Sequence, residues 1–208
     1  MKKIIFTLLA LVLAFSMVGC AAGAPQQNAG KGASTAKAPE NHEYITYTDL
    51  LGNLSFDYPS NWDAKEASIS LLVNKETGKG NNISIEFEEY DYKNDPYKNI
   101  TEESFKTLFG NAYAAAGINI GNLKIEQVEN DKGVSIQRIS FFAKSATSPD
   151  LTETIYCVLA GNFYYFITLV EVDADAPLKE QLFQSITVLV PTDIPEDAAP
   201  ETDAPKAE

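Results

Sequence analysis

The chain has 208 residues, with 29 acidic and 16 basic side chains, and its net charge at pH 7 is −13. Proteins that bind nucleic acids or anionic lipid surfaces neutralise phosphates with clusters of Lys and Arg, so a chain with a single arginine, Arg138, is expected to bind neither. The one histidine, His42, lies outside the segment that is expected to fold, which removes from that segment the commonest general base and the commonest metal ligand.

The first residues have the pattern of an export signal. Two lysines precede an apolar run of about 15 residues, which suits a secretory signal and is short for a transmembrane helix of roughly 20 residues. The run ends in Met-Val-Gly-Cys at positions 17–20, a sequence that resembles the lipobox of bacterial lipoproteins. The resemblance implies a signal peptide over residues 1–19 and a diacylglycerol thioether on Cys20. The alternative is an ordinary signal cut after Ala24, which Pro25 directly after the cut makes less favourable.

A lipid on Cys20 implies a protein anchored at the extracytoplasmic face of the cell membrane, with the bilayer as its first partner. Each buried methylene adds about 0.8 kcal/mol of membrane affinity, so two or three acyl chains anchor a protein firmly. The second cysteine, Cys157, then has no disulfide partner in the chain. Since Cys157 lies among strand-forming residues, we expect a small buried side chain there, with a reactive thiol as the alternative.

Two segments of biased composition flank the part that is expected to fold. Residues 20–43 contain almost no large apolar side chain, which predicts a flexible linker behind the anchor. As a random coil this linker spans on the order of 25 Å. Residues 191–208 are rich in Pro and acid, which predicts a disordered tail. A single domain over residues 44–190 remains between them.

Most of that domain alternates between apolar and polar side chains, which is typical of half-buried β-strands. The alternation predicts strands over residues 54–58, 69–73 and 83–87, with a hairpin between the second and the third, and another strand from Leu123. A turn over residues 130–133 leads into a strand over 134–144. The apolar phase of this strand slips between Ile136 and Ile139, which predicts a β-bulge.

Two later strands, over residues 152–160 and 162–170, are apolar on both faces, and Gly161-Asn162 joins them in a tight turn. A strand that is apolar on both faces is buried on both faces. We therefore expect this pair at the centre of the sheet, with cover on each side.

Helical spacing occurs twice. Thr101 suits an N-cap before Glu102 and Glu103, and one apolar stripe follows and can end at Gly117: Phe105, Leu108, Phe109, Ala112 and Ala116. The second helix is expected to start at Asp173 or Asp175, to hold Pro177 in its first turn, and to bury Leu178, Leu182 and Ile186. The order of elements predicts an α+β fold in which a largely antiparallel sheet is flanked by two helices.

The stretch LSFDYPSNWD at residues 54–63 resembles the PsbP family of photosystem II extrinsic proteins and its bacterial DcrB-like relatives. In these proteins a strand with alternating aromatic residues leads into Tyr-Pro-x-x-Trp, which corresponds here to Tyr58, Pro59 and Trp62. The resemblance implies an α/β/α sandwich but no single activity, since the same fold includes a Ran-binding import factor. We expect Trp62 to be a structural anchor, with a ligand contact as the alternative.

The chain lacks the common signatures of catalysis. It contains no nucleophile elbow, no zinc-protease motif and no phosphate-binding loop, and its domain has no histidine to pair with a serine or cysteine. No cofactor and no metal is expected from these residues. A pair of carboxylates about 5–9 Å apart, as in glycosidases, stays open because sequence alone cannot bring two acids together.

One polar segment, residues 88–100, suggests recognition. It carries three tyrosines and two aspartates: Tyr90, Asp91, Tyr92, Asp95 and Tyr97. Tyrosines offer rigid contact area at a low cost in entropy, which suits a partner-binding loop. The alternatives are tyrosines that lie over the sheet edge with the acids in water, or a Ca²⁺ site at Asp91 and Asp95.

The sequence thus favours a membrane-anchored, non-catalytic lipoprotein that binds an unknown protein or component of the cell envelope. One rival is a solute-binding lipoprotein of a transporter, although about 147 residues are few for two lobes around a cleft. The other is a carboxylate-based hydrolase.

Overall fold

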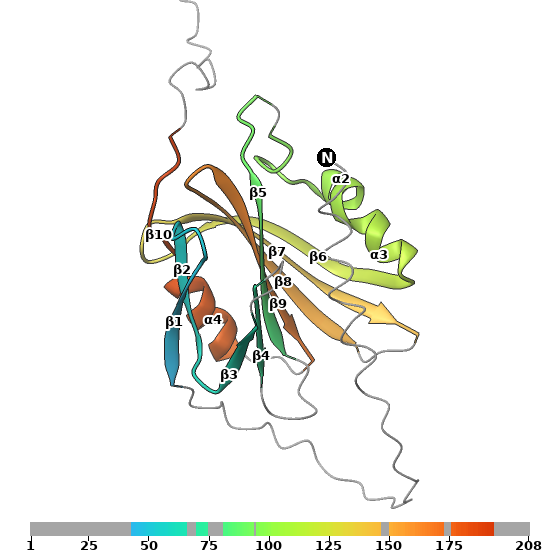
Figure 1. Cartoon of the computed structure of the whole chain (residues 1–208). Coiled ribbons are helices and arrows are strands. Elements are labelled where there is room, and N and C mark those ends of the chain that lie inside the picture. Colours follow the sequence, from blue (N-terminus) through green and yellow to red (C-terminus); the bar gives the residue numbers. More distant parts are fainter. Residues whose placement is uncertain are drawn as a thin grey trace, which may run out of the picture.

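The computed structural model describes residues 43–65, 70–74, 81–93, 95–146, 150–172 and 176–193. In these ranges the chain forms two antiparallel sheets, with helices on both faces of the larger one (Figure 1). The predicted signal peptide, Cys20, the linker and the tail after residue 193 lie outside the described residues.

The larger sheet has seven strands, all antiparallel to their neighbours. In spatial order they are β3 (Trp62–Lys65), β4 (Ser70–Asn74), β5 (Asn82–Glu89), β9 (Phe163–Glu171), β8 (Leu151–Ala160), β7 (Ser135–Ser145) and β6 (Ile118–Glu129). As predicted, the two strands that are apolar on both faces, β8 and β9, are central and are joined through Gly161-Asn162.

The smaller sheet pairs β2 (Leu54–Pro59) with β1 (Tyr44–Thr48) on one side and β10 (Thr187–Val188) on the other. Pro59 ends β2, because proline cannot donate to a sheet ladder, and the chain turns through residues 60–61 into β3 of the large sheet. Tyr58 and Trp62, on either side of this turn, are buried in one core, where a structural anchor is expected to lie.

A helical segment covers one face of the large sheet. It consists of α2 (Glu102–Phe105), the π-helical turn η1 (Lys106–Gly110) and α3 (Asn111–Ala115). Thr101 caps it as predicted, and Gly117 follows it with a φ of 72°. Hydrogen bonds in the π turn join residues i and i+5, so each residue rotates less about the helix axis than in an α-helix. Side chains four positions apart then stay on one side, which keeps Phe105, Phe109 and Tyr113 over the sheet.

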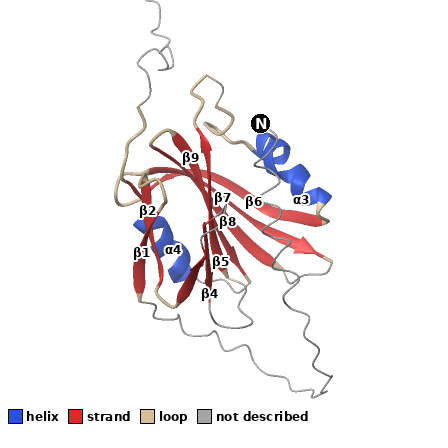
Figure 2. Ribbon diagram, viewed as in Figure 1, coloured by secondary structure: helices blue, strands red, loops and turns tan. Residues whose placement is uncertain are grey.

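The helix α4 (Ala176–Ser185) covers the opposite face of the sheet, as Figure 2 shows. Its side chains Leu178 and Leu182, with Ile186 just after the helix, are buried against the small sheet and the large one, as predicted. The predicted caps Asp173 and Asp175 lie outside the described residues. The two cores, one on each side of the large sheet, confirm the predicted α+β fold with an antiparallel sheet between two helices.

The bulge predicted in residues 134–144 is wrong. β7 keeps a continuous register with β8, and its pairing with β6 is regular from Ser135 to Ser140. The irregularity of the β6–β7 ladder lies in β6, between Gly121 and Lys124, where Asn122 has a φ of 52°. Ile136 faces the core under α4 and Ile139 faces the core under α3. Each face of the strand contributes a side chain to a different core, so the odd spacing of Ile136 and Ile139 needs no bulge.

The turn between β6 and β7 fastens the C-terminal end of α4. The buried amide of Asn130 donates two hydrogen bonds, to the carbonyls of Phe183 (3.1 Å) and Ile186 (2.8 Å). Its oxygen accepts from the backbone amides of Lys132 (3.1 Å) and Val134 (3.0 Å). One side chain thereby closes the turn and satisfies carbonyls at the end of the helix.

Replacing Asn130 by Ala is expected to lower the free energy of unfolding by about 2–4 kcal/mol, because buried carbonyls and amides lose their partners. Urea denaturation followed by circular dichroism measures the change. Asp131→Ala is the control in the same turn, since Asp131 is exposed, and its effect is expected within about 0.5 kcal/mol. Equal losses in both variants would contradict this role of Asn130.

Two carboxyl groups are buried on the α3 side of the large sheet, Glu86 in β5 and Glu153 in β8. The Tyr113 hydroxyl donates a 2.6 Å hydrogen bond to Glu153. Burial raises the pKa of Glu86 to about 7, and it raises the pKa of Glu153 to about 7 even though the Tyr113 bond acts in the other direction. Both groups therefore hold a proton in the folded chain at pH values where the unfolded chain has lost it.

Stability is accordingly expected to fall as the pH rises. Below the unfolded pKa near 4.5 both states are protonated and the stabilisation is complete; as the pH rises to about 7 the unfolded state alone releases protons, which disfavours folding. At about 1.4 kcal/mol per pKa unit, each carboxyl accounts for up to roughly 3 kcal/mol. Denaturation of wild type and of the double variant Glu86→Gln/Glu153→Gln between pH 5 and pH 8 tests this, and the variant should lose most of the slope. A slope that persists in the variant would assign it to other groups.

Candidate binding surface

The predicted recognition segment, residues 88–100, is partly used for internal packing. The carboxylate of Asp95 accepts hydrogen bonds from the Tyr164 hydroxyl (2.7 Å) and the Tyr97 backbone amide (2.9 Å). The Tyr97 hydroxyl donates to the Glu88 carboxylate (2.5 Å). These bonds fix the segment against β5 and β9, so Asp95 and Tyr97 contribute to structure.

The same segment also continues an aromatic cluster on the sheet. The ring of Tyr97 lies 5.3 Å from that of Tyr164 and 4.9 Å from that of Phe166, and Tyr90 lies 5.6 Å from Tyr164, all near edge-to-face. Such geometry is favourable for aromatic pairs. Tyr90 is half-buried as a result, which agrees with tyrosines that lie over the sheet.

Of the five predicted residues, Asp91 and Tyr92 face solvent. Asp91 accepts a hydrogen bond from the Lys93 backbone amide (3.0 Å), and the Lys93 ammonium lies 5.5 Å from the Tyr92 ring centre. Two of the predicted residues, Asp91 and Tyr92, are therefore available to a partner. The other three, Tyr90, Asp95 and Tyr97, pack against the domain.

Exposed apolar side chains gather beside this segment, and sequence reasoning missed them. Leu50 and Leu51 lie in the turn between β1 and β2, and Leu189 and Val190 directly follow β10; all four are more than two-fifths exposed. The backbone carbonyl of Asn53 accepts hydrogen bonds from the amides of Leu189 (2.8 Å) and Val190 (3.2 Å), which places residues 189–190 beside the turn that carries Leu50 and Leu51.

The turn between β8 and β9 joins these segments to one another. The Gly161 amide donates to the Val190 carbonyl (2.6 Å), and the Tyr90 amide donates to the Asn162 carbonyl (2.8 Å). Gly161 has a φ of 56°, and a Cβ there would lie 2.8 Å from the Asn53 side chain. Only glycine fits a left-handed position so close to a neighbour.

Phe87, near the end of β5, extends the apolar surface. Its ring is exposed and contacts the rings of Phe163 (5.4 Å) and Tyr165 (5.7 Å) beside the same turn. We call the exposed side chains on these segments the apolar rim: Leu50, Leu51, Phe87, Tyr92, Leu189 and Val190. Their segments meet at one end of the molecule, in the upper part of Figure 1.

A buried carboxylate holds the rim in place. Asp49 accepts hydrogen bonds from the backbone amides of Leu51 (2.9 Å), Asn53 (2.7 Å) and Leu54 (2.7 Å), and from the Tyr165 hydroxyl (2.9 Å). The Asn53 amide also donates to the Tyr165 oxygen (3.0 Å). Leu50 and Leu51 are thus presented to solvent on a fixed turn.

The described ranges hold no exposed thiol and no cluster of metal ligands. The Cys157 thiol is buried as predicted, and burial raises its pKa to about 12. No three His, Cys, Asp or Glu side chains of these ranges group as a metal site requires. None of the described helices has the length and apolar character that crossing a membrane demands.

The chain matches no protein-family model and no curated protein. Among solved structures it is similar to a cyanobacterial PsbP (CyanoP) of Synechocystis, with 12% identity and a TM-score of 0.52 over 76% of this chain and 98% of that one. The Ran-binding protein Mog1p of Saccharomyces cerevisiae has 8% identity and a TM-score of 0.49 over 72% of this chain and 97% of that one.

A protein of Bacteroides thetaiotaomicron has 13% identity and a TM-score of 0.36 over 69% of this chain and 47% of that one. At such identities a similar structure speaks for the fold alone. The antiparallel large sheet with helices on both faces and the similarity to CyanoP agree with the fold that the Tyr-Pro-x-x-Trp stretch predicts. This chain has the α+β fold of cyanobacterial PsbP.

Proposed function

We propose that this protein is a lipid-anchored, non-catalytic binding module of the bacterial cell envelope, and that the apolar rim contacts a protein partner. The observation that carries the proposal is the clustering of exposed apolar groups. Eight large apolar side chains are exposed in the described ranges, and six of them form the rim. Exposed apolar side chains that gather at one end of a molecule mark interaction sites.

The charges beside the rim favour a protein over a lipid surface. Glu89, Asp91 and Asp193 are exposed on the segments that carry the rim, and the whole chain is strongly acidic. Anionic lipids repel such a surface, whereas a partner with an apolar pocket and flanking Lys or Arg complements it. The expected partner is therefore an envelope protein with a basic, partly apolar face.

The burial of reactive groups supports a role without catalysis. Glu153 is fully buried, and the Tyr113 hydroxyl occupies one of its oxygens. Cys157 is buried with a raised pKa, so little thiolate is present at neutral pH. A carboxylate-based hydrolase would need acids that substrate can reach, which makes it the weaker alternative.

Lipid anchoring is tested by metabolic labelling with an alkyne fatty acid, because the two cysteines provide a matched pair of variants. Wild type and Cys157→Ala are expected to carry the label and to sediment with membranes, while Cys20→Ser loses the label and is released. A label that survives Cys20→Ser, or a mature chain that starts at Pro25 without lipid, would contradict the proposal.

The rim is tested by photo-crosslinking in cells of the native host. A benzoyl-phenylalanine at Leu50 and another at Leu189 are expected to yield the same protein adduct, because both positions lie on one surface. Leu51→Asp, introduced beside the probe at Leu189, is expected to reduce that adduct at least fivefold through the burial of a charge.

Asn111, exposed on α3, is the control position for the same probe and is expected to yield no such adduct. Circular dichroism checks that each variant folds. Adducts with lipid alone, different adducts from Leu50 and Leu189, or an adduct that Leu51→Asp leaves unchanged would exclude the rim as the partner surface.

A further inference from the structure

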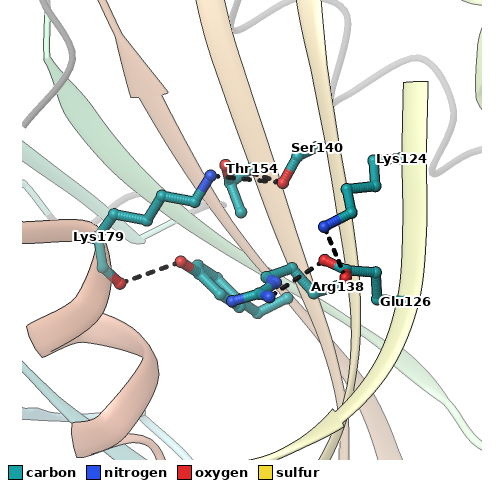
Figure 3. Close-up of polar contacts among 7 residues, drawn as sticks. Lys124, Glu126, Arg138, Ser140, Thr154 and Lys179 are labelled. Carbon is teal, nitrogen blue, oxygen red and sulfur yellow. Dashed lines mark hydrogen bonds and ion pairs between the residues drawn. The ribbon is translucent and has the colours of Figure 1, made fainter. Parts of the chain in front are cut away.

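A cluster of polar and charged side chains lies on the α4 side of the large sheet, away from the apolar rim. Thr154 in β8, a member of this cluster, precedes Gly161 by seven residues, or about 23 Å along the strand. Figure 3 shows Lys124 and Glu126 from β6, Arg138 and Ser140 from β7, and Lys179 from α4 around this position. The only arginine of an acidic chain thus stands between two lysines.

The side chain of Arg138 is fixed but has unused donors. Its guanidinium donates to the Glu126 carboxylate (3.1 Å) and lies 5.2 Å from the ring centre of Phe183. Lys124 binds the other oxygen of Glu126 (2.7 Å). Two cations therefore share one carboxylate. A guanidinium has five N–H donors, and the ion pair with Glu126 leaves some of them available to a ligand.

The ammonium of Lys179 is the least satisfied cation of the cluster. It is half-buried and makes one hydrogen bond among the described residues, a long one of 3.5 Å to the Ser140 hydroxyl. Burial lowers the pKa of Lys179; among neighbouring charges, Arg138 and Lys124 act in the same direction, while Glu171 and Glu126 act against it. An anion at this position would replace the lost hydration of the ammonium.

A hydroxyl pair completes the set of donors. The oxygens of Ser140 and Thr154 lie 3.3 Å apart, and Thr154 is fully buried, so it can orient the Ser140 hydroxyl but not touch a ligand. The Tyr156 hydroxyl donates to the backbone carbonyl of Lys179 (3.2 Å), which fixes the backbone from which the lysine side chain extends. The donors are held by neighbours before any ligand arrives, which lowers the cost of binding.

The arrangement of donors favours a tetrahedral anion. Lys179, Ser140 and Arg138 approach from a helix and a strand, so their donors do not share one plane. A carboxylate prefers two parallel N–H groups of one arginine, and here Glu126 already takes one nitrogen of Arg138. Phe142, two residues after Ser140 and on the same face of β7, is 41% exposed and offers apolar contact beside the cluster. A phosphate ester combines a tetrahedral anion with an organic group that can contact the phenylalanine.

We propose that the cluster binds the phosphate group of an organic phosphate ester, with Lys179 and Ser140 as the central donors and Arg138 and Lys124 as the surrounding charges. The ester is either a small molecule or the headgroup of a lipid, and the chemistry at the cluster is the same for both. This site is independent of the apolar rim.

The proposal is tested with the full chain in detergent micelles, by calorimetric titration and amide chemical shifts. The probes are inorganic phosphate, phenyl phosphate, and phosphatidylglycerol mixed into the micelles. Saturable changes in amide chemical shift are expected at Ser140 and Lys179 with at least one probe. Lys179→Gln is expected to weaken binding roughly tenfold, because the anion loses its charged hydrogen-bond donor.

Ser140→Ala is the second variant and is expected to weaken binding a few-fold with the fold intact. Lys106→Gln is the matched control, since Lys106 is 69% exposed and pairs with Glu102 on the opposite face of the sheet, and its affinity should equal that of wild type. Binding of phenyl phosphate identifies a small ester, and binding of phosphatidylglycerol alone identifies a lipid headgroup. No saturable binding of any probe, or binding that Lys179→Gln leaves unchanged, would overturn the proposal.

Discussion

The carboxylate of Asp49 connects the two sheets of this protein, and the arrangement of the rest depends on it. It accepts three backbone amides of the β1–β2 turn and the hydroxyl of Tyr165, which belongs to the centre of the large sheet. Hydrogen bonds to a charged group are each worth about 1.5–3 kcal/mol. With Asn53 against Gly161, this contact sets where the small sheet lies on the large one, and it encloses one of the two cores.

Local patterns were sufficient for most of the secondary structure. Thr101 before two glutamates indicated a helix start, Gly161-Asn162 indicated a turn, and two-sided apolar strands indicated the central pair. The short strands β1, β3 and β10 were not predicted, because each has few residues and gains its order from pairing with a neighbour far along the chain. The predicted bulge failed for a related reason: Ile136 and Ile139 lie in different cores, and their order in sequence does not tell which helix covers which face.

The candidate sites were harder to predict than the fold. The tyrosines of residues 88–100 drew attention by composition, yet Tyr97 and Asp95 use their polar atoms within the domain. Leu50 and Leu189 are 139 positions apart and become neighbours through the Asn53 carbonyl, so no local pattern joins them. The phosphate cluster likewise needs α4 to place Lys179 over β7. The one indication of the apolar rim in the sequence was the pair of adjacent leucines in a polar turn, residues 49–53.

The direction of β1 has a consequence for how the domain would stand on a membrane. The described chain begins at Glu43, next to one end of this strand, and Leu50 follows its other end, about 17 Å away for five residues. If acyl chains on Cys20 hold the protein, the tether pulls on the end of the domain opposite to the leucines. The apolar groups would then lie on the part of the domain farthest from its attachment point, and a partner in the same membrane would have to extend above the bilayer or wait for the predicted flexible linker to turn the domain toward it.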